Sequence, residues 1–141
     1  LSHTRFGYGA ATVRKMRLDG KGNIVVLAAA NDRLDLGVGA TDKGTFVVGL
    51  GPDAGKPTNL VAHPDTMDFG VDSNGEVVVL TKAKLTRYSA DGKTAKWTAT
   101  WKSHGDNRPG AMTVSPDTGV AAVTGYGMTH TGKEPYKDPY G

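Results

Sequence analysis

The sequence predicts an all-β fold, and three observations carry that prediction. A phrase of apolar strand, Asp-x-x-Gly turn and apolar strand occurs at residues 16–27 and 69–80, with a looser copy at 112–123. The turn glycines at positions 22, 75 and 119 are 53 and then 44 residues apart. No stretch keeps the i, i+3, i+4, i+7 apolar spacing of an amphipathic helix. Hairpins that recur every ~40–50 residues are typical of propeller blades, so we expect four-stranded antiparallel blades of a β-propeller.

The first predicted blade covers residues 10–51, with strands expected at 13–19, 23–30, 33–40 and 45–50. The second of these is a nearly continuous apolar run, as expected of a strand covered on both faces. The third alternates Leu34, Leu36 and Val38, the period of a half-buried strand. The glycine- and proline-rich stretch 51–57 is expected to cross to the next blade.

The second predicted blade covers residues 63–102, with strands at 66–72, 76–81, 84–89 and 94–101 and a hairpin turn at Asp91-Gly92. A partial third blade covers residues 110–141, with strands at 111–115 and 120–126. Residues 127–141 show no clear strand pattern. The whole chain therefore reads as one partial propeller of about 2.5 blades, fewer than the 4–8 of a closed ring.

Three arrangements follow from that shortfall. The chain is a fragment of a larger propeller, or several copies close one ring, or the repeats pack as a sandwich or barrel instead. We expect the first, and the partners of this chain then include the remaining propeller blades.

The phrase Asp-x-x-Gly-x-(Ile/Val)-Val-Val-Leu at residues 19–27 and 72–80 resembles the repeats of bacterial extracytoplasmic β-propellers. Repeats of the NHL-like, SBBP-like and quinoprotein-like groups share this hairpin pattern. The resemblance spans most of the chain. It implies a propeller fold and an extracellular or periplasmic location. The chain lacks the kelch glycine pair, the terminal Trp-Asp of WD repeats and the tryptophan docking motif of quinoprotein dehydrogenases, so no catalytic residue is carried over.

Composition excludes several classes of site. The chain has no cysteine, which excludes disulfides, thiolate catalysis and Cys-ligated zinc. Its 17 basic and 14 acidic residues give a dispersed charge of +3 without a basic aromatic stripe, so we expect no nucleic-acid partner. No apolar run approaches the length of a transmembrane helix, so we expect no membrane span.

The candidate ligand face is formed by the connections from the fourth strand to the next blade and from the second strand to the third. These connections emerge on one side of a propeller, and all four histidines are expected in connections of this kind. Asn31 and Asp32 would join them, and so would tyrosines of two X-Pro-Tyr units near the end of the chain. The predicted partner face comprises His63, Asp65, His104, Asp106, His130, Tyr136 and Tyr140.

These features favour a non-enzymatic structural or interaction module with a protein partner, no catalytic residue and no cofactor. One alternative is a propeller enzyme with a metal ion or redox centre at the channel, for which the imidazoles of His3, His63, His104 and His130 are the candidate ligands. Another is a carbohydrate-binding module with Trp97 and Trp101 as a stacking platform. The competing interpretation of these tryptophans is packing between blades.

Overall fold

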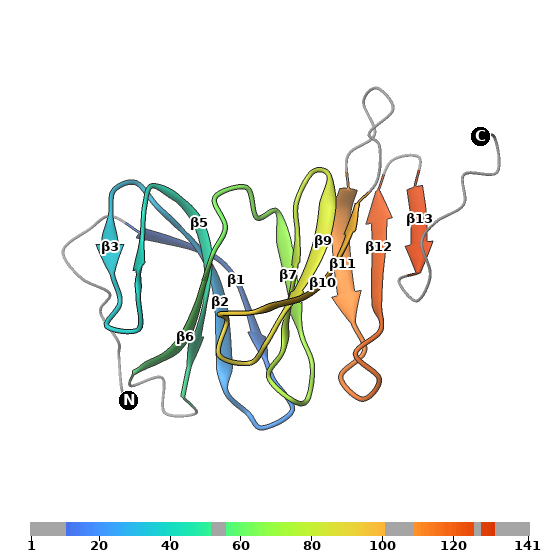
Figure 1. Ribbon diagram of the computed structural model, residues 1–141, viewed down its shortest axis with the longest axis horizontal. Helices are drawn as coiled ribbons and strands as arrows, with labels where there is room; N and C mark the ends of the chain where they lie inside the picture. Colours follow the sequence, from blue (N-terminus) through green and yellow to red (C-terminus); the bar gives the residue numbers. More distant parts are fainter. Residues whose placement is uncertain (1–10, 52–55, 101–108, 126–127, 132–141) are drawn as a thin grey trace.

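The computed structural model describes residues 11–51, 56–100, 109–125 and 128–131. These residues form thirteen strands, grouped into three main antiparallel sheets that stand side by side and one small hairpin (Figure 1). The all-β prediction is confirmed for this part of the chain, which contains no helix and hence none that could cross a membrane.

The first sheet has the order β1-β2-β5-β6, from β1 (Ala11–Leu18) and β2 (Ile24–Ala30) to β5 (Gly44–Leu50) and β6 (Pro57–Ala62). The two predicted inner strands are confirmed. The predicted 45–50 strand forms, but it is the third strand of the sheet rather than the fourth. The fourth is β6, so the stretch after residue 50 joins two strands of one sheet and does not cross to the next blade. The sheet therefore extends past the limit of 51 expected for this unit.

The prediction of a strand over residues 33–40 is wrong. This segment instead forms a two-stranded hairpin of β3 (Leu34–Asp35) and β4 (Ala40–Thr41), outside the four-stranded sheet. Gly37 and Gly39 adopt φ values of 76° and 148°, which turn the chain back on itself. Leu34 and Leu36 are buried against the first sheet, so their alternation reflects a hairpin laid on the sheet.

The second sheet confirms the predicted strand order. It runs β7 (Asp68–Val71), β8 (Val77–Leu80), β9 (Lys84–Tyr88) and β10 (Ala95–Thr100), each strand paired with the next. The third sheet contains the two expected strands, β11 (Pro109–Val114) and β12 (Ala121–Gly125). It also contains β13 (Met128–Thr131), although no strand was predicted there.

The repeated phrase forms the same turn twice. Asp19 Oδ1 accepts hydrogen bonds from the backbone nitrogens of Lys21 and Asn23, both at 2.8 Å. Asp72 Oδ1 accepts the equivalent bonds from residues 74 and 76, at 2.9 and 3.0 Å. Gly22 and Gly75 both have φ of 80°, which explains the glycine at the fourth position. The phrase is therefore an Asx turn that closes the hairpin between the first two strands of a sheet.

The sheets pack on one another through two apolar clusters. In the first, β2, β5 and β6 of the first sheet meet β7 and β8 of the second. Its members are Val25, Leu27, Val47, Val61, Phe69, Val71, Val77 and Val79. In the second, the opposite face of the second sheet meets the third sheet through Val78, Leu80, Leu85, Met112, Ala121 and Val123. Burial of each large side chain contributes ~1.5–3 kcal/mol, so these clusters fix the order of the sheets.

The inner strands β1, β7 and β11 are neighbours, as in blades that radiate from one axis. A polar cluster centred on the buried carboxylate of Asp68 ties all three together. Lys15 Nζ lies 2.8 Å from Asp68 Oδ1, and the backbone nitrogen of Met112 donates to Oδ2 at 3.0 Å. Arg17 donates to the carbonyl oxygens of Phe69 and Met112, at 2.8 and 3.2 Å. The spacing of the sheets is thus fixed at the inner edge by directional bonds.

A second polar cluster lies at the hairpin-turn end. Arg87 on β9 pairs with Asp72 and donates from Nε to Glu76 Oε2 at 2.6 Å. Its Nη1 donates to the carbonyl oxygen of Gly119 at 3.0 Å, which joins the second sheet to the turn of the third. Lys96 completes the cluster by pairing with Glu76.

Candidate functional site

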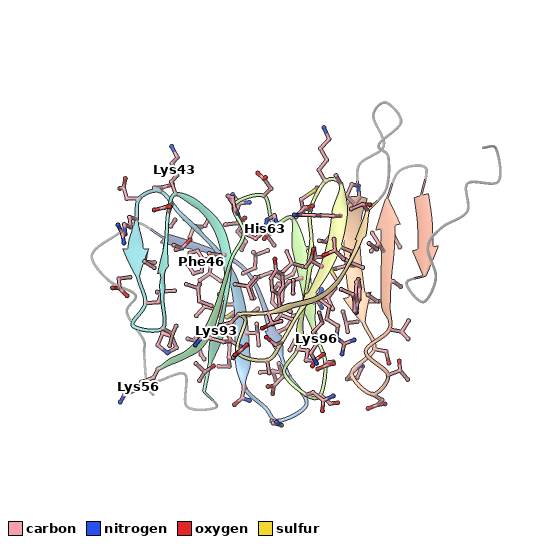
Figure 2. The ribbon with its side chains drawn as sticks, viewed as in Figure 1. Lys43, Phe46, Lys56, His63, Lys93 and Lys96 are labelled. Carbon is pink, nitrogen blue, oxygen red and sulfur yellow. The ribbon has the colours of Figure 1, made fainter. Side chains whose placement is uncertain are left out.

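The candidate site is a hollow of about 550 Å³ at the end of the first sheet opposite the Asx turns, where the connection that leads to the second sheet lies against it. It is lined from three directions: the inner strand β1, the connections on either side of the β3–β4 hairpin, and the connection from β6 to β7. The lining residues with a charged side chain or a side-chain amide are Arg14, Asn31, Lys43 and Asp65. Lys43 and His63 lie toward this end of the molecule, and Lys56 lies at the opposite end (Figure 2).

The floor of the hollow is held by Thr45. Its hydroxyl donates toward the carbonyl oxygens of His63 and Pro64, at 2.9 and 2.8 Å, and accepts from the backbone nitrogen of Thr66 at 2.9 Å. The backbone of Gly44 lies so close to Pro64 that a Cβ atom at position 44 would be 2.8 Å from Pro64 Cβ. The connection before the second sheet is therefore clamped onto the first sheet, and Asp65 is displayed from a fixed turn.

Arg14 reaches the hollow because of a β-bulge. The pairing of β1 with β2 shifts between Val13 and Lys15, so Arg14 is the extra residue. A bulge redirects the side chain of the inserted residue. Arg14 therefore lines the hollow, whereas Val13 and Lys15 keep their places in the pairing with β2. Because of the bulge, Val13 and Met16 share a face of the sheet although they are three residues apart.

Lys43 and Met67, which also line the hollow, had no sequence signal. Lys43 sits in an ordinary Thr-Asp-Lys-Gly turn, and Met67 follows the clamped connection with 42% of its surface exposed. Among the described residues, neither Arg14 nor Lys43 forms an ion pair or side-chain hydrogen bond. Both side chains are exposed.

His63 is close to the hollow without lining it. Its ring is half-buried, and Nδ1 is a buried atom with no hydrogen-bond partner in the described part of the chain. Burial lowers the pKa of His63 below its ordinary 6.5, and the charge of Lys84 lowers it further. The neutral form of the His63 imidazole is therefore favoured at neutral pH. His63 supports the floor of the site and contributes no positive charge to it.

The structure therefore describes two of the seven residues predicted for the partner face, His63 and Asp65, together with the backbone of a third, His130. Asp65 and Asn31 lie in connections between strands and line one hollow, and their place in a partner face stays a prediction. His130 lies within strand β13 opposite Val123, so the prediction that all four histidines fall in connections is wrong. The other predicted residues lie outside the described part: His3, His104, Asp106, Tyr136 and Tyr140.

The described residues contain no group of three or more His, Cys, Asp or Glu side chains that could hold a metal ion. Trp97 is partly buried and packs against the cluster between the second and third sheets. This position is the one expected if Trp97 packs between blades. The ring of Trp97 is therefore not free to act as a stacking surface for a carbohydrate. Trp101 lies outside the described residues.

No protein-family model and no curated protein matches this sequence. Among solved structures, the chain is similar to the β-propeller domain of Cps50 (Swd1) from Myceliophteria thermophila, with a TM-score of 0.56 and 8% sequence identity. The similarity covers 89% of this chain and 39% of that chain, so this chain spans well under half of the domain that it matches. At this identity the similarity concerns the fold alone, and the β-propeller fold predicted from the repeat is confirmed.

Proposed function

We propose that this chain is an interaction module of the β-propeller type and that the hollow lined by Arg14, Lys43 and Asp65 binds an acidic segment of a protein partner. The observation that carries the proposal is the pair of cations. Arg14 and Lys43 come from distant elements, line one hollow, and lack ion-pair partners among the described residues. A guanidinium or ammonium group that has no ion-pair partner binds carboxylates favourably.

The remaining lining groups indicate which kind of partner segment would fit the hollow. Asn31 supplies an amide that can donate to and accept from a peptide backbone. Met67 offers a flexible apolar surface, of the kind that adapts to varied side chains. Asp65 would repel a carboxylate on its own side of the hollow and favour a donor there. A segment with spaced acidic and apolar residues fits this combination better than a uniformly charged polymer.

The test is a fluorescence-anisotropy titration with a labelled peptide of alternating glutamate and leucine. The double variant Arg14→Glu/Lys43→Glu should lose binding by about tenfold or more, since each reversed pair costs roughly 1 kcal/mol near a surface. The matched control is Lys56→Glu/Lys93→Glu, which makes the same change of net charge away from the hollow and should bind like the wild type. Equal binding by both double variants would refute the proposal.

We further propose that the module acts outside the cytoplasm, as part of a propeller of the bacterial extracytoplasmic kind. The support is the resemblance of the phrase at residues 19–27 and 72–80 to such repeats. The expected partner face continues to include His104, Asp106, Tyr136 and Tyr140. Fractionation of the source cells tests the location, and recovery of the protein in the cytoplasmic fraction would refute it.

A further inference from the structure

The face of the first sheet that points away from the second sheet exposes a row of large apolar side chains on β1. Val13, Met16 and Leu18 are 51%, 66% and 68% exposed. They stand opposite Ala28, Val26 and Ile24 of β2, which belong to or pack against the cluster on that face. Three large apolar side chains aligned on one strand mark an interaction surface.

The repeat shows what such a row normally contacts. Met16 and Leu18 stand three and one residues before the turn residue Asp19, as Phe69 and Val71 stand before Asp72. Phe69 and Val71 are 0% and 7% exposed, because the preceding sheet packs on them.

The third sheet repeats the arrangement. Met112 and Val114 hold the same positions before Ser115 and pack against the second sheet. In both cases this position on the inner strand faces the sheet before it. The row on β1 holds the same position, and no sheet formed by the described residues packs on it.

The β3–β4 hairpin covers part of this face and leaves the row open. Leu34 and Leu36 pack over β2 and β5, away from the inner strand. Sheets that radiate from one axis are closest at their inner strands and diverge outward. A hairpin that fills the outer part of the gap is therefore compatible with direct contact between β1 and another sheet.

The third sheet of a second copy would be a poor occupant. Its outward face presents Ala111, Thr113, Ala122 and Thr124, which are small or polar and mostly exposed. The faces that cover Phe69 and Met112 are instead rich in valine and leucine, for example Val25 and Leu27, or Val78 and Leu80. The row needs an apolar face of that second kind.

We propose that the row Val13–Met16–Leu18 receives a further four-stranded sheet of the same repeat, carried by the same polypeptide, whose valine- and leucine-rich face closes on β1. Three sheets are fewer than the ~4–8 of a closed propeller, and the two sheet contacts described here both join successive sheets of one chain. This inference rests on exposure and repeat position and is independent of the ligand proposed for the hollow.

The chain contains its own reporters for a test by peroxide oxidation and peptide mass spectrometry. In the 141-residue chain, Met16 should oxidise about as fast as Met67, and Met112, which is 5% exposed, should oxidise far more slowly. In the natural polypeptide, oxidation of Met16 should slow by about tenfold toward the rate of Met112, while Met67 keeps its rate. Leu18→Asp should lower the unfolding midpoint of the natural polypeptide and leave that of the 141-residue chain unchanged.

Three outcomes would overturn the proposal. One is that Met16 oxidises equally fast in both forms. Another is that protection of Met16 appears in the 141-residue chain and grows with its concentration, which identifies a second copy as the occupant. The third is a natural polypeptide with a mass of 14.7 kDa, which leaves no further sheet to dock.

Discussion

Lys15 Nζ lies 2.8 Å from Asp68 Oδ1 and joins the inner strands of the first and second sheets across their interface. Asp68 is 1% exposed and also accepts hydrogen bonds from the backbone nitrogens of Phe69 and Met112. One buried carboxylate thus serves three sheets. Lys15 directly follows Arg14 on β1, so this contact anchors the strand that brings Arg14 to the hollow.

Removal of the Asp68 carboxylate should destabilise the fold. Asp68→Ala leaves the buried Met112 nitrogen without its acceptor and two cations without their counterion, at a cost of ~3 kcal/mol. Urea denaturation measures the change in the free energy of unfolding. Asp65→Ala is the matched control, because that exposed carboxylate should leave the free energy unchanged. Equal midpoints for wild type and Asp68→Ala would contradict this role.

Gly70 should not tolerate a methyl group. A Cβ at this position would lie 2.2 Å from Val114 Cγ2, in the contact between β7 and β11. Gly70→Ala should cost ~1–3 kcal/mol by overpacking, and Val114→Ala in the same chain should recover part of that loss. Gly110→Ala, whose new Cβ would have no neighbour closer than 3.6 Å, should be nearly neutral. Strictly additive effects of the two alanines would show that this contact does not set the sheet spacing.

Glu76 should make stability depend on acid pH. The hydrogen bond from Lys96, followed by that from Arg87, lowers the pKa of Glu76 below its ordinary 4.5 despite partial burial. The stabilisation from this group is complete above 4.5 and is lost as the pH falls through the lower folded value. Glu76→Gln should therefore show a shallower loss of unfolding free energy in acid than wild type, measured by denaturation across that range.

Lys96→Gln should move the pKa of Glu76 back toward 4.5, and Lys93→Gln, on a residue that does not pair with Glu76, should not. Parallel acid profiles for wild type and Glu76→Gln would show that the cluster contributes nothing to stability.

His63 should titrate below 6.5 in the folded protein, because burial and the charge of Lys84 both disfavour the imidazolium. The unfolded chain then binds the proton more tightly, so protonation of this group removes stability as the pH falls below 6.5. NMR titration of the ring protons measures the value directly. Lys84→Gln should raise the pKa toward 6.5 and Lys56→Gln should leave it unchanged; a wild-type value above 6.5 would contradict the described surroundings.

The turns and the second sheet were predictable because their signals are local. An Asp that binds the nitrogens two and four residues later, with glycine at positive φ, is visible in the sequence at both Asp19 and Asp72. The order of β7 to β10 follows from short hairpins. The hairpin at residues 34–41 was misassigned because Leu34 and Leu36 alternate like a strand, and its glycines decide the outcome.

Two strands were missed for different reasons. β6 starts at Pro57 inside a glycine- and proline-rich stretch, and proline is tolerated there because β6 is an edge strand and Pro57 its first residue. β13 forms from Met-Thr-His-Thr, which lacks apolar alternation and is ordered by its pairing with β12. In both cases the neighbouring strand supplies the information.

The site was only partly predictable. Asp65 and Asn31 could be assigned to one end of the molecule from the order of connections. Arg14 depends on a bulge, and Lys43 depends on where the misassigned hairpin places its turn. The partners of Asp68 are 53 and 44 residues away, so they are set by sheet packing that no local pattern encodes.

The proposed partner surface is the end of the molecule around Arg14, Lys43 and Asp65. A photo-crosslinking amino acid at position 43, with position 56 at the opposite end as the matched control, tests this in the source cells (Figure 2). We predict a discrete crosslinked protein from position 43 that is lost when Arg14→Glu is added, and none from position 56. Crosslinks of equal yield from both positions, or from position 56 alone, would contradict the claim.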